Sequence, residues 1–186
     1  MNQRSTFFLD SPGLFTKILK SLVLVITVFA VTACKDGEGP SVGYNRSFAP
    51  KQPIAFDHSL HAGKYKIDCQ YCHSNAEVSR HASVPSLNIC MNCHLTVGQS
   101  DEIQKLRDAY NNNESIEWVK VHMLPDFVHF NHRRHVRRGV ACQTCHGEVE
   151  SMKVLSQHKD LSMGWCVDCH RKPENNAPTN CSTCHQ

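Results

Sequence analysis

The chain has 186 residues, of which 11 are cysteine and 13 are histidine, while only 8% are aromatic. Its 20 Lys and Arg residues against 17 Asp and Glu residues make a charge balance too even for a nucleic-acid-binding protein. Apolar side chains alone would make a thin core, so disulfides, metal ions or a covalent cofactor are needed to hold the fold together.

Residues 1–33 have the organisation of a secretory signal peptide. The basic residues Arg4, Lys17 and Lys20 come first, and the uncharged stretch 21–33 follows. This stretch is shorter than the ~20 residues of a membrane-spanning helix. It ends Val31-Thr-Ala-Cys34, which resembles a bacterial lipobox, so we expect cleavage before Cys34 and lipidation of its thiol and amine. The alternatives are an uncleaved signal anchor and an ordinary signal peptide with an incidental cysteine.

Export determines the chemistry open to the other cysteines. We expect the mature chain to be lipid-anchored on the periplasmic side of a bacterial membrane, either inner or outer. In that compartment disulfides persist and c-type haem can be attached, whereas zinc sites of the cytosolic kind are less expected.

The other ten cysteines form five pairs of one type, C-x-x-C-H. The motifs are Cys69-Gln-Tyr-Cys72-His73, Cys90-Met-Asn-Cys93-His94, Cys142-Gln-Thr-Cys145-His146, Cys166-Val-Asp-Cys169-His170 and Cys181-Ser-Thr-Cys184-His185. Two thiols three positions apart can bind the two vinyl groups of one porphyrin, and the next residue then binds the iron from the proximal side. Zinc and disulfide frameworks also use C-x-x-C pairs, but neither requires a histidine after every pair. The sequence therefore predicts five covalently bound haem c groups with five proximal histidines.

Six of the remaining histidines belong to an internal repeat. Phe56-Asp-His58-Ser-Leu-His61 precedes the first motif, and Phe130-Asn-His132-Arg-Arg-His135 precedes the third. In each copy a lone histidine, His81 or His158, lies between the two C-x-x-C-H motifs. The chain is therefore two copies of one two-haem unit, at 56–94 and 130–170, followed by a fifth haem site.

The F-x-H-x-x-H pattern resembles the class III cytochromes of the c7 and c3 type, and residues 130–186 have the full c7 order of motifs. The resemblance implies mainly short α-helices and irregular loops wrapped around five haems, with little or no β-sheet. It also implies the distal iron ligands. Each distal histidine pairs with one proximal histidine: His58 with His73, His61 with His94, His132 with His146, His135 with His170, and His158 with His185.

Three histidines receive no partner from this resemblance. His81 and His122 are alternative iron ligands, or else surface or propionate-contacting residues. For His129 we favour the surface or propionate role. Met91 lies inside the second motif, so one His/Met site is an alternative to bis-histidine ligation at all irons.

An iron with two histidine ligands has no open position for a substrate, so these ligand sets favour electron transfer over catalysis. We therefore expect an electron-transfer protein rather than an enzyme in its own right. The rival classes are a haem-based oxyanion reductase and a stand-alone multihaem lipoprotein carrier of the outer membrane.

Longer sequence segments indicate a more specific family resemblance. They are Pro53-Ile-Ala-Phe-Asp-His58, Val84-Pro-Ser-Leu-Asn-Ile-Cys90-Met-Asn-Cys-His94, Trp118-Val-Lys-Val-His122-Met-Leu-Pro-Asp126 and Met163-Gly-Trp-Cys166-Val-Asp-Cys-His170. The set resembles the pentahaem cytochrome subunit of alternative complex III, a bacterial quinol:electron-acceptor oxidoreductase. The resemblance implies a periplasmic subunit beside iron–sulfur and quinol-oxidising membrane subunits, relaying electrons to a cytochrome c or a terminal oxidase. A lipobox stands where that family usually has a membrane-spanning anchor.

The remaining segments complete the predicted organisation. Residues 34–52 are expected to be a flexible tether, 53–94 a two-haem module, 95–129 a haem-free connector with a short amphipathic helix at 101–110, and 130–186 a three-haem module. Four arginines interleave with the second F-x-H-x-x-H pattern: Arg133, Arg134, Arg137 and Arg138. We expect them to neutralise haem propionates; an acidic docking partner or a merely solvated face are the alternatives.

Overall fold

The computed structural model describes Lys17, Lys20 and residues 45–186. The expected signal peptide and the lipidation site Cys34 lie outside the described residues. Contacts divide the chain into two units, Met1–Glu38 and Gly39–Gln186, and the fold below is that of the second unit. No helix of the described part is long and apolar enough to span a membrane.

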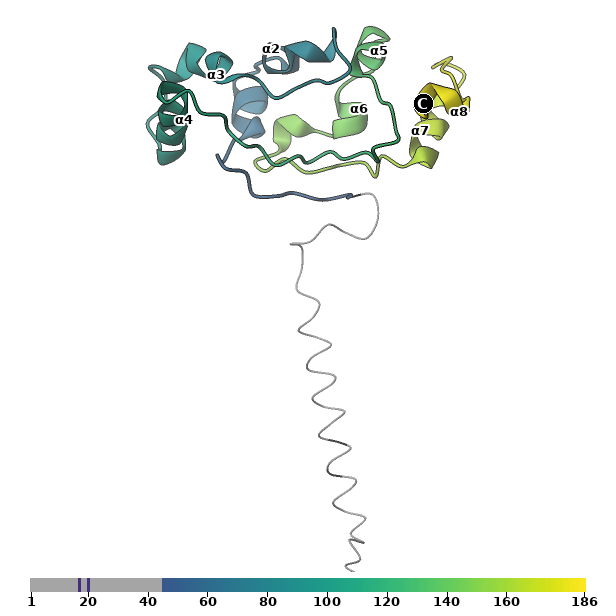
Figure 1. The fold of residues 1–186 in the computed structure, drawn as a ribbon, viewed down its shortest axis with the longest axis horizontal. Coiled ribbons are helices and arrows are strands. Elements are labelled where there is room, and N and C mark those ends of the chain that lie inside the picture. Colours follow the sequence, from purple (N-terminus) through teal and green to yellow (C-terminus); the bar gives the residue numbers. More distant parts are fainter. Residues whose placement is uncertain (1–16, 18–19, 21–44) are drawn as a thin grey trace, which may run out of the picture. The chain divides into compact units, whose positions relative to one another are not determined.

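Short helices joined by loops build this unit, and residues 45–186 contain no β-strand (Figure 1). The elements are η1 (Ser59–Lys64), α2 (Cys69–Cys72), η2 (Ser74–Ala76), α3 (Leu87–His94), α4 (Asp101–Asn111), α5 (His132–Arg137), α6 (Gln143–His146), η3 (Val149–Ser151), α7 (Met163–His170) and α8 (Cys181–Cys184). Here η1 is a π-helical turn, and η2 and η3 are 3₁₀-helical turns. This architecture agrees with the fold predicted from the motifs.

The five C-x-x-C-H motifs coincide with the five helices α2, α3, α6, α7 and α8. A helical turn places residues i and i+3 on one face, so both thiols of a motif point the same way. Polar side chains before three of these helices accept the first free backbone N–H groups, which fixes where the helix begins. The caps are Asp68 to Gln70 N (2.7 Å), Ser162 to Trp165 N (3.2 Å) and Asn180 to Thr183 N (3.0 Å).

The amphipathic helix expected at 101–110 is present as α4, with Ser100 accepting a hydrogen bond from Ile103 N. Its apolar face buries Leu106 against Ile54 and Met91, and Trp118 packs on this cluster. The cluster joins α4 to α3, so it supports the helix that carries the second motif.

The two repeats pack on each other reciprocally. η1 of the first copy lies against η3 of the second, and α5 of the second lies against η2 of the first. Ser59 N donates to Met152 O (3.1 Å), and Arg133 N donates to Ser79 O (3.0 Å). Both donors directly follow the first histidine of an F-x-H-x-x-H pattern, and both acceptors stand six residues after a motif histidine. The internal repeat of the sequence is thus an internal symmetry of the fold.

The connector 95–129 runs from one end of this unit to the other. Near its start Arg107 Nε donates to His94 O (2.7 Å), and at its end His129 N donates to Cys184 O (2.8 Å). Residues 45–52, which we expected in the flexible tether, are held along it, because Gln52 exchanges two hydrogen bonds with the backbone of Val119. Ser47 N and Phe48 O also bond to the backbone of Gln157, so these residues of the expected tether contact the haem-motif unit.

Candidate haem sites

We number the C-x-x-C-H motifs site 1 to site 5 in chain order. Their ten cysteines are all free thiols and all exposed or half-buried. Thiols in this state are the groups that add to porphyrin vinyl groups, and no disulfide competes for them within residues 45–186.

Thiols of adjacent sites interact with each other, and these interactions define the order of the sites. Burial raises the pKa of the Cys90 thiol of site 2, and the Cys72 thiol of site 1 raises it further. Burial likewise raises the pKa of Cys69 in site 1, together with the charge and hydrogen bond of Cys142 in site 3. Site 1 therefore lies between sites 2 and 3.

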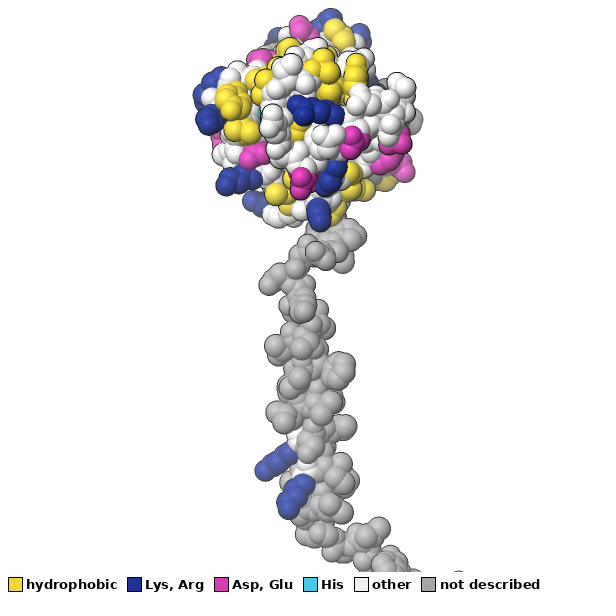
Figure 2. Space-filling model, turned by 90° about the vertical axis from the view of Figure 1, so that its left-hand side faces the viewer, with side chains coloured by type: hydrophobic (Ala, Val, Ile, Leu, Met, Phe, Trp, Pro, Cys, Tyr) yellow, Lys and Arg dark blue, Asp and Glu magenta, His cyan; other side chains and the backbone are white. Residues whose placement is uncertain are grey.

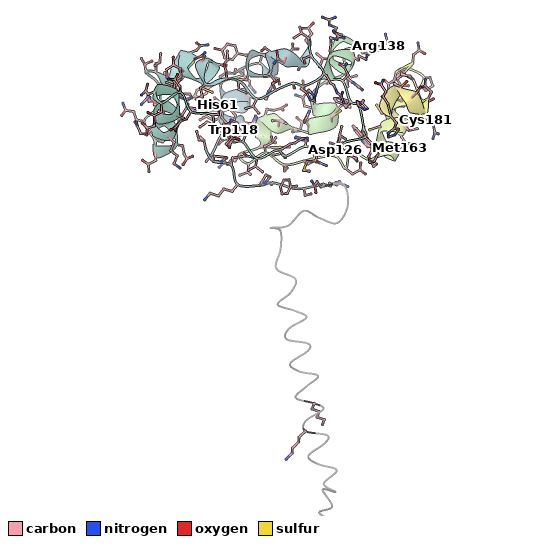
Figure 3. All side chains as sticks on the ribbon, viewed as in Figure 1. His61, Trp118, Asp126, Arg138, Met163 and Cys181 are labelled. Carbon is pink, nitrogen blue, oxygen red and sulfur yellow. The ribbon has the colours of Figure 1, made fainter. Side chains whose placement is uncertain are left out.

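The order continues through the second repeat. Burial raises the pKa of Cys145 in site 3 to about 11, with a contribution from Cys169 of site 4. Burial also raises the pKa of Cys166 in site 4, with a contribution from Cys184 of site 5. The sites thus form the series 2–1–3–4–5, and the helices α3, α2, α6, α7 and α8 follow one another in this order in Figure 1. Figure 3 labels Cys181 of site 5 at one end of the unit.

Three of the five histidine pairs implied by the class III resemblance face each other at a haem-like spacing. An imidazole nitrogen binds a metal at about 2 Å and the ring centre lies roughly 1 Å further out, so two axial histidines have ring centres about 6 Å apart. The observed separations are 6.0 Å for His61 and His94, 6.3 Å for His132 and His146, and 5.9 Å for His135 and His170.

The other two pairs differ. Burial lowers the pKa of His58 to about 4 and the nearby His73 contributes, so these rings are neighbours, although no ring contact joins them. The His58 Nδ1 atom is buried without a hydrogen-bond partner. His158 lies against the Gly147 backbone rather than beside His185, with which it makes no ring contact within residues 45–186.

The phenylalanine of each F-x-H-x-x-H pattern orients both of its histidines. Phe56 stacks on His61 (4.4 Å between ring centres), and Phe130 stacks on His135 (4.5 Å). The same two phenylalanine rings meet His58 and His132 edge-on, both at 4.8 Å. Such paired stacked and edge-to-face contacts fix ring planes, which explains why the pattern contains an aromatic residue.

Most candidate ligands have one ring nitrogen committed to a backbone carbonyl. The Nδ1 contacts are His73 to Ser83 O (2.6 Å), His94 to Val97 O (3.0 Å), His170 to Pro178 O (2.7 Å), His185 to Phe127 O (3.2 Å), His61 to Asp57 O (2.8 Å), His132 to Arg80 O (3.0 Å) and His135 to Asn131 O (2.9 Å). A carbonyl only accepts, so Nδ1 carries the proton and Nε2 keeps a lone pair for iron. These residues therefore fit haem ligation.

His146 is the exception among the proximal histidines. Its Nδ1 lies 3.2 Å from Nε2 of His122, with ring centres 4.4 Å apart and planes at 79°. Burial lowers the pKa of both rings to about 4, so both are neutral at pH 7. This contact puts His122, a possible alternative ligand in the sequence, on the Nδ1 side of His146, whereas His132 faces it at the ligand spacing.

The remaining candidates make no ring contact with the paired histidines within the described residues. The exposed His81 side chain makes no hydrogen bond or ring contact within the described residues, and Met91 is only 3% exposed in the apolar core. The four arginines of 133–138 are exposed. The ion pair found within residues 45–186 joins Lys105 and Glu102, so these arginines have no carboxylate partner there.

Two family models match consecutive parts of the chain. The model of the class III cytochrome c family matches residues 39–124, and the model of cytochrome c7 and related cytochrome c matches residues 128–186. A search of the curated proteins found no match. With the motifs and paired histidines above, these matches make the chain a multihaem c-type cytochrome, an electron-transfer class that carries covalently bound haem c. Its fold, short helices and loops without a strand in the described part, is that of the class III, c7-like cytochromes, which confirms the predicted fold class.

Sequence reasoning did not anticipate the contact of His122 with His146 or that of His158 with Gly147. His122 stands 24 residues before His146 in a segment without a haem motif. No spacing rule links the two, so only the path of the connector could reveal the contact.

Proposed function

We propose that this chain relays electrons through five covalently bound haems, along the series of sites 2–1–3–4–5. The observation that carries the proposal is the unbroken chain of neighbouring thiols from Cys90 to Cys184. Each attachment site has another at its side, so a relay of short steps can connect the two ends of the unit.

The proposed ligands are the proximal histidines of the five motifs, with His58, His61, His132, His135 and His158 as distal partners. Bound haem would supply reversible one-electron storage at its iron. The protein would fill both axial positions with imidazole and so exclude water and substrates from the metal. Each F-x-H-x-x-H turn would hold two neighbouring sites together, because its two histidines serve different motifs. Three of the first four pairs have the ring spacings described above, His58 and His73 are neighbours by their electrostatic interaction, and the pair of His158 with His185 rests on the class III resemblance.

We further propose that the relay works at a membrane. The lipobox-like ending at Cys34 supports a lipid anchor, and the strings shared with the pentahaem subunit of alternative complex III support a quinol-oxidising complex as electron donor. A cytochrome c or terminal oxidase would be the acceptor. The end of the unit that carries α4, seen in Figure 2, mixes hydrophobic side chains with both signs of charge.

Redox titration followed by EPR spectroscopy of the purified haem-loaded protein tests the relay. Five low-spin haems that bind neither CO nor cyanide are expected. A five-coordinate iron that binds these ligands would favour the oxyanion reductase instead.

Paired variants test the order of the series. Replacing Cys69 and Cys72 with alanine should isolate site 2 and abolish electron exchange between the two ends. The matched loss of Cys181 and Cys184 should leave exchange among sites 2, 1, 3 and 4 intact. Equal effects of the two variants would contradict the proposed order.

Extraction in mild detergent tests the partners and the anchor. Co-purification with iron–sulfur and quinol-oxidising subunits is expected, together with incorporation of labelled palmitate that a Cys34→Ser variant loses. A protein recovered alone from the outer membrane would be a stand-alone carrier.

A further inference from the structure

The reciprocal packing of the repeats places sites 1 and 3 in equivalent surroundings. Their proximal histidines are His73 and His146, and their first distal histidines are His58 and His132. The thiols of Cys69 and Cys142 meet between them. The two sites thus have the same types of ligand, although their distal histidines differ, because Nδ1 of His132 meets Arg80 O whereas Nδ1 of His58 has no hydrogen-bond partner.

The proximal histidines of the two sites also differ, in the bond made by Nδ1. His73 Nδ1 donates to the carbonyl of Ser83 at 2.6 Å, as the proximal histidines of sites 2, 4 and 5 do to other carbonyls. His146 Nδ1 instead meets the imidazole of His122 at 3.2 Å. Because Nε2 of His146 is the nitrogen left for iron, Nδ1 carries the proton and donates it to His122 Nε2.

The connector holds His122 in this place from both sides. Val121 before it is buried, at 5% exposure. Met123, the residue after His122, donates its backbone N–H to the side chain of the fully buried Gln157 (3.2 Å). Asn45 Nδ2 contacts the sulfur atom of Met123 (3.3 Å). His122 therefore occupies a built position rather than a chance contact of a surface ring.

We propose that His122 is a positioning residue that lowers the reduction potential of the haem at site 3. The proposal rests on the proposed function, because it assumes a haem ligated by His146. An imidazole nitrogen is a far stronger base than an amide oxygen, so it draws the Nδ1 proton more strongly and leaves His146 a better electron donor to iron. A more electron-donating ligand stabilises the oxidised iron, and bonds of this kind orient and tune metal ligands.

The test compares two substitutions at this position in the haem-loaded protein. His122→Leu removes the acceptor, and His122→Gln offers an amide oxygen like the carbonyls at the other four sites. We expect the oxidised-to-reduced ratio at site 3 to fall roughly tenfold in His122→Leu at a fixed applied potential, a rise in potential of about 59 mV for a one-electron couple. In His122→Gln we expect a smaller rise of the same sign.

Redox titration with EPR resolves the individual haems. The signal that a His132→Met variant alters is assigned to site 3. The matched control is His129→Leu, since the His129 side chain makes no hydrogen bond or ring contact within residues 45–186, and it should leave the site 3 potential unchanged.

Several outcomes would overturn the proposal while leaving the relay intact. One is an unchanged site 3 potential in His122→Leu at full haem content. If that variant loses haem, a wild-type potential in His122→Gln decides against it. A high-spin site 3 in either variant would make His122 a ligand instead. A wild-type protein without low-spin haem would reject the proposed function itself.

Discussion

A histidine that binds iron must keep one ring nitrogen free, and in this chain the other nitrogen shows how that is arranged. Seven of the candidate ligands direct Nδ1 at a backbone carbonyl, and His146 directs it at His122. Backbone carbonyls are part of the fold itself, so the tautomer of each ligand is fixed once the loop around it forms.

Gly147 carries a prediction at the scale of a single residue. It follows His146 with φ +74° and ψ −168°, a region that L-residues with a side chain seldom adopt, and a Cβ there would lie 2.6 Å from Cγ of His158. Gly147→Ala should therefore destabilise the haem-loaded protein by about 1–3 kcal/mol and displace His158. The measurement is thermal unfolding followed by Soret absorbance.

Gly139→Ala is the matched control, because Gly139 also has a positive φ of +81° but nothing lies within 4 Å of its added Cβ. Gly139→Ala should lower the free energy of unfolding by about 1 kcal/mol, the cost of placing a residue with a Cβ at positive φ. Equal destabilisation by the two substitutions would show that contact with His158 contributes nothing.

The sequence predicts which residues hold haem, and the structure brings three of the predicted histidine pairs together, but how these residues are supported was not predictable. The motif C-x-x-C-H predicts haem attachment at five places, and the repeat F-x-H-x-x-H predicts the distal histidines. Met91 shows the limit, since a thioether inside a motif suggested a ligand, whereas the helix turns it into the apolar core beside Leu106. His122 shows the converse, because its contact depends on a connector whose path no local pattern encodes.

Among the elements, α5 combines two functions in six residues. One turn of helix puts His132 and His135 on the same side, three positions apart, where their rings lie beside His146 of site 3 and His170 of site 4. The arginines between and after them are exposed and carry positive charge close to both sites. Figure 3 shows Arg138 at the outer edge of the unit, just beyond α5.

Replacing these four arginines with glutamine should lower the potential of the haem at site 3 or site 4. Loss of positive charge makes the oxidised iron less unfavourable, so the sign is downward. The measurement is a redox titration at low salt, and the shift should shrink in high salt because exposed charges are screened. The fourfold Arg→Lys variant keeps the charge and should keep the potentials. Unchanged potentials in the glutamine variant would reject the charge-compensation role.

At the scale of the whole molecule, neither repeat is complete without the other. The turn η1 of the first copy packs on η3 of the second, and α5 packs back on η2. The backbones approach closely at Gly63, where an added Cβ would lie 2.3 Å from the carbonyl oxygen of Glu150. The two repeats therefore share one interior. The buried apolar side chains of the described residues are too few to form a separate core for each repeat.

Gly63→Ala should force η1 away from η3 and destabilise the haem-loaded protein by about 1–3 kcal/mol, as overpacking of a close contact does. Gly164→Ala is the control, since its added Cβ would meet only Ser162 Oγ, at 4.0 Å. Chemical denaturation followed by haem absorbance measures both. A Gly63→Ala variant as stable as the control would mean that the repeats are not held together at this contact.

The connector has a consequence for the dimensions of the molecule. Its start contacts His94 of site 2 and its end contacts Cys184 of site 5, the two extremes of the series. An extended residue spans at most about 3.3–3.6 Å, so the number of residues after α4 sets an upper limit on how far apart those extremes can stand. The length of this stretch without a haem motif therefore limits the distance between site 2 and site 5. Inserting residues elsewhere would enlarge a loop, whereas shortening this stretch would bring site 2 and site 5 closer together.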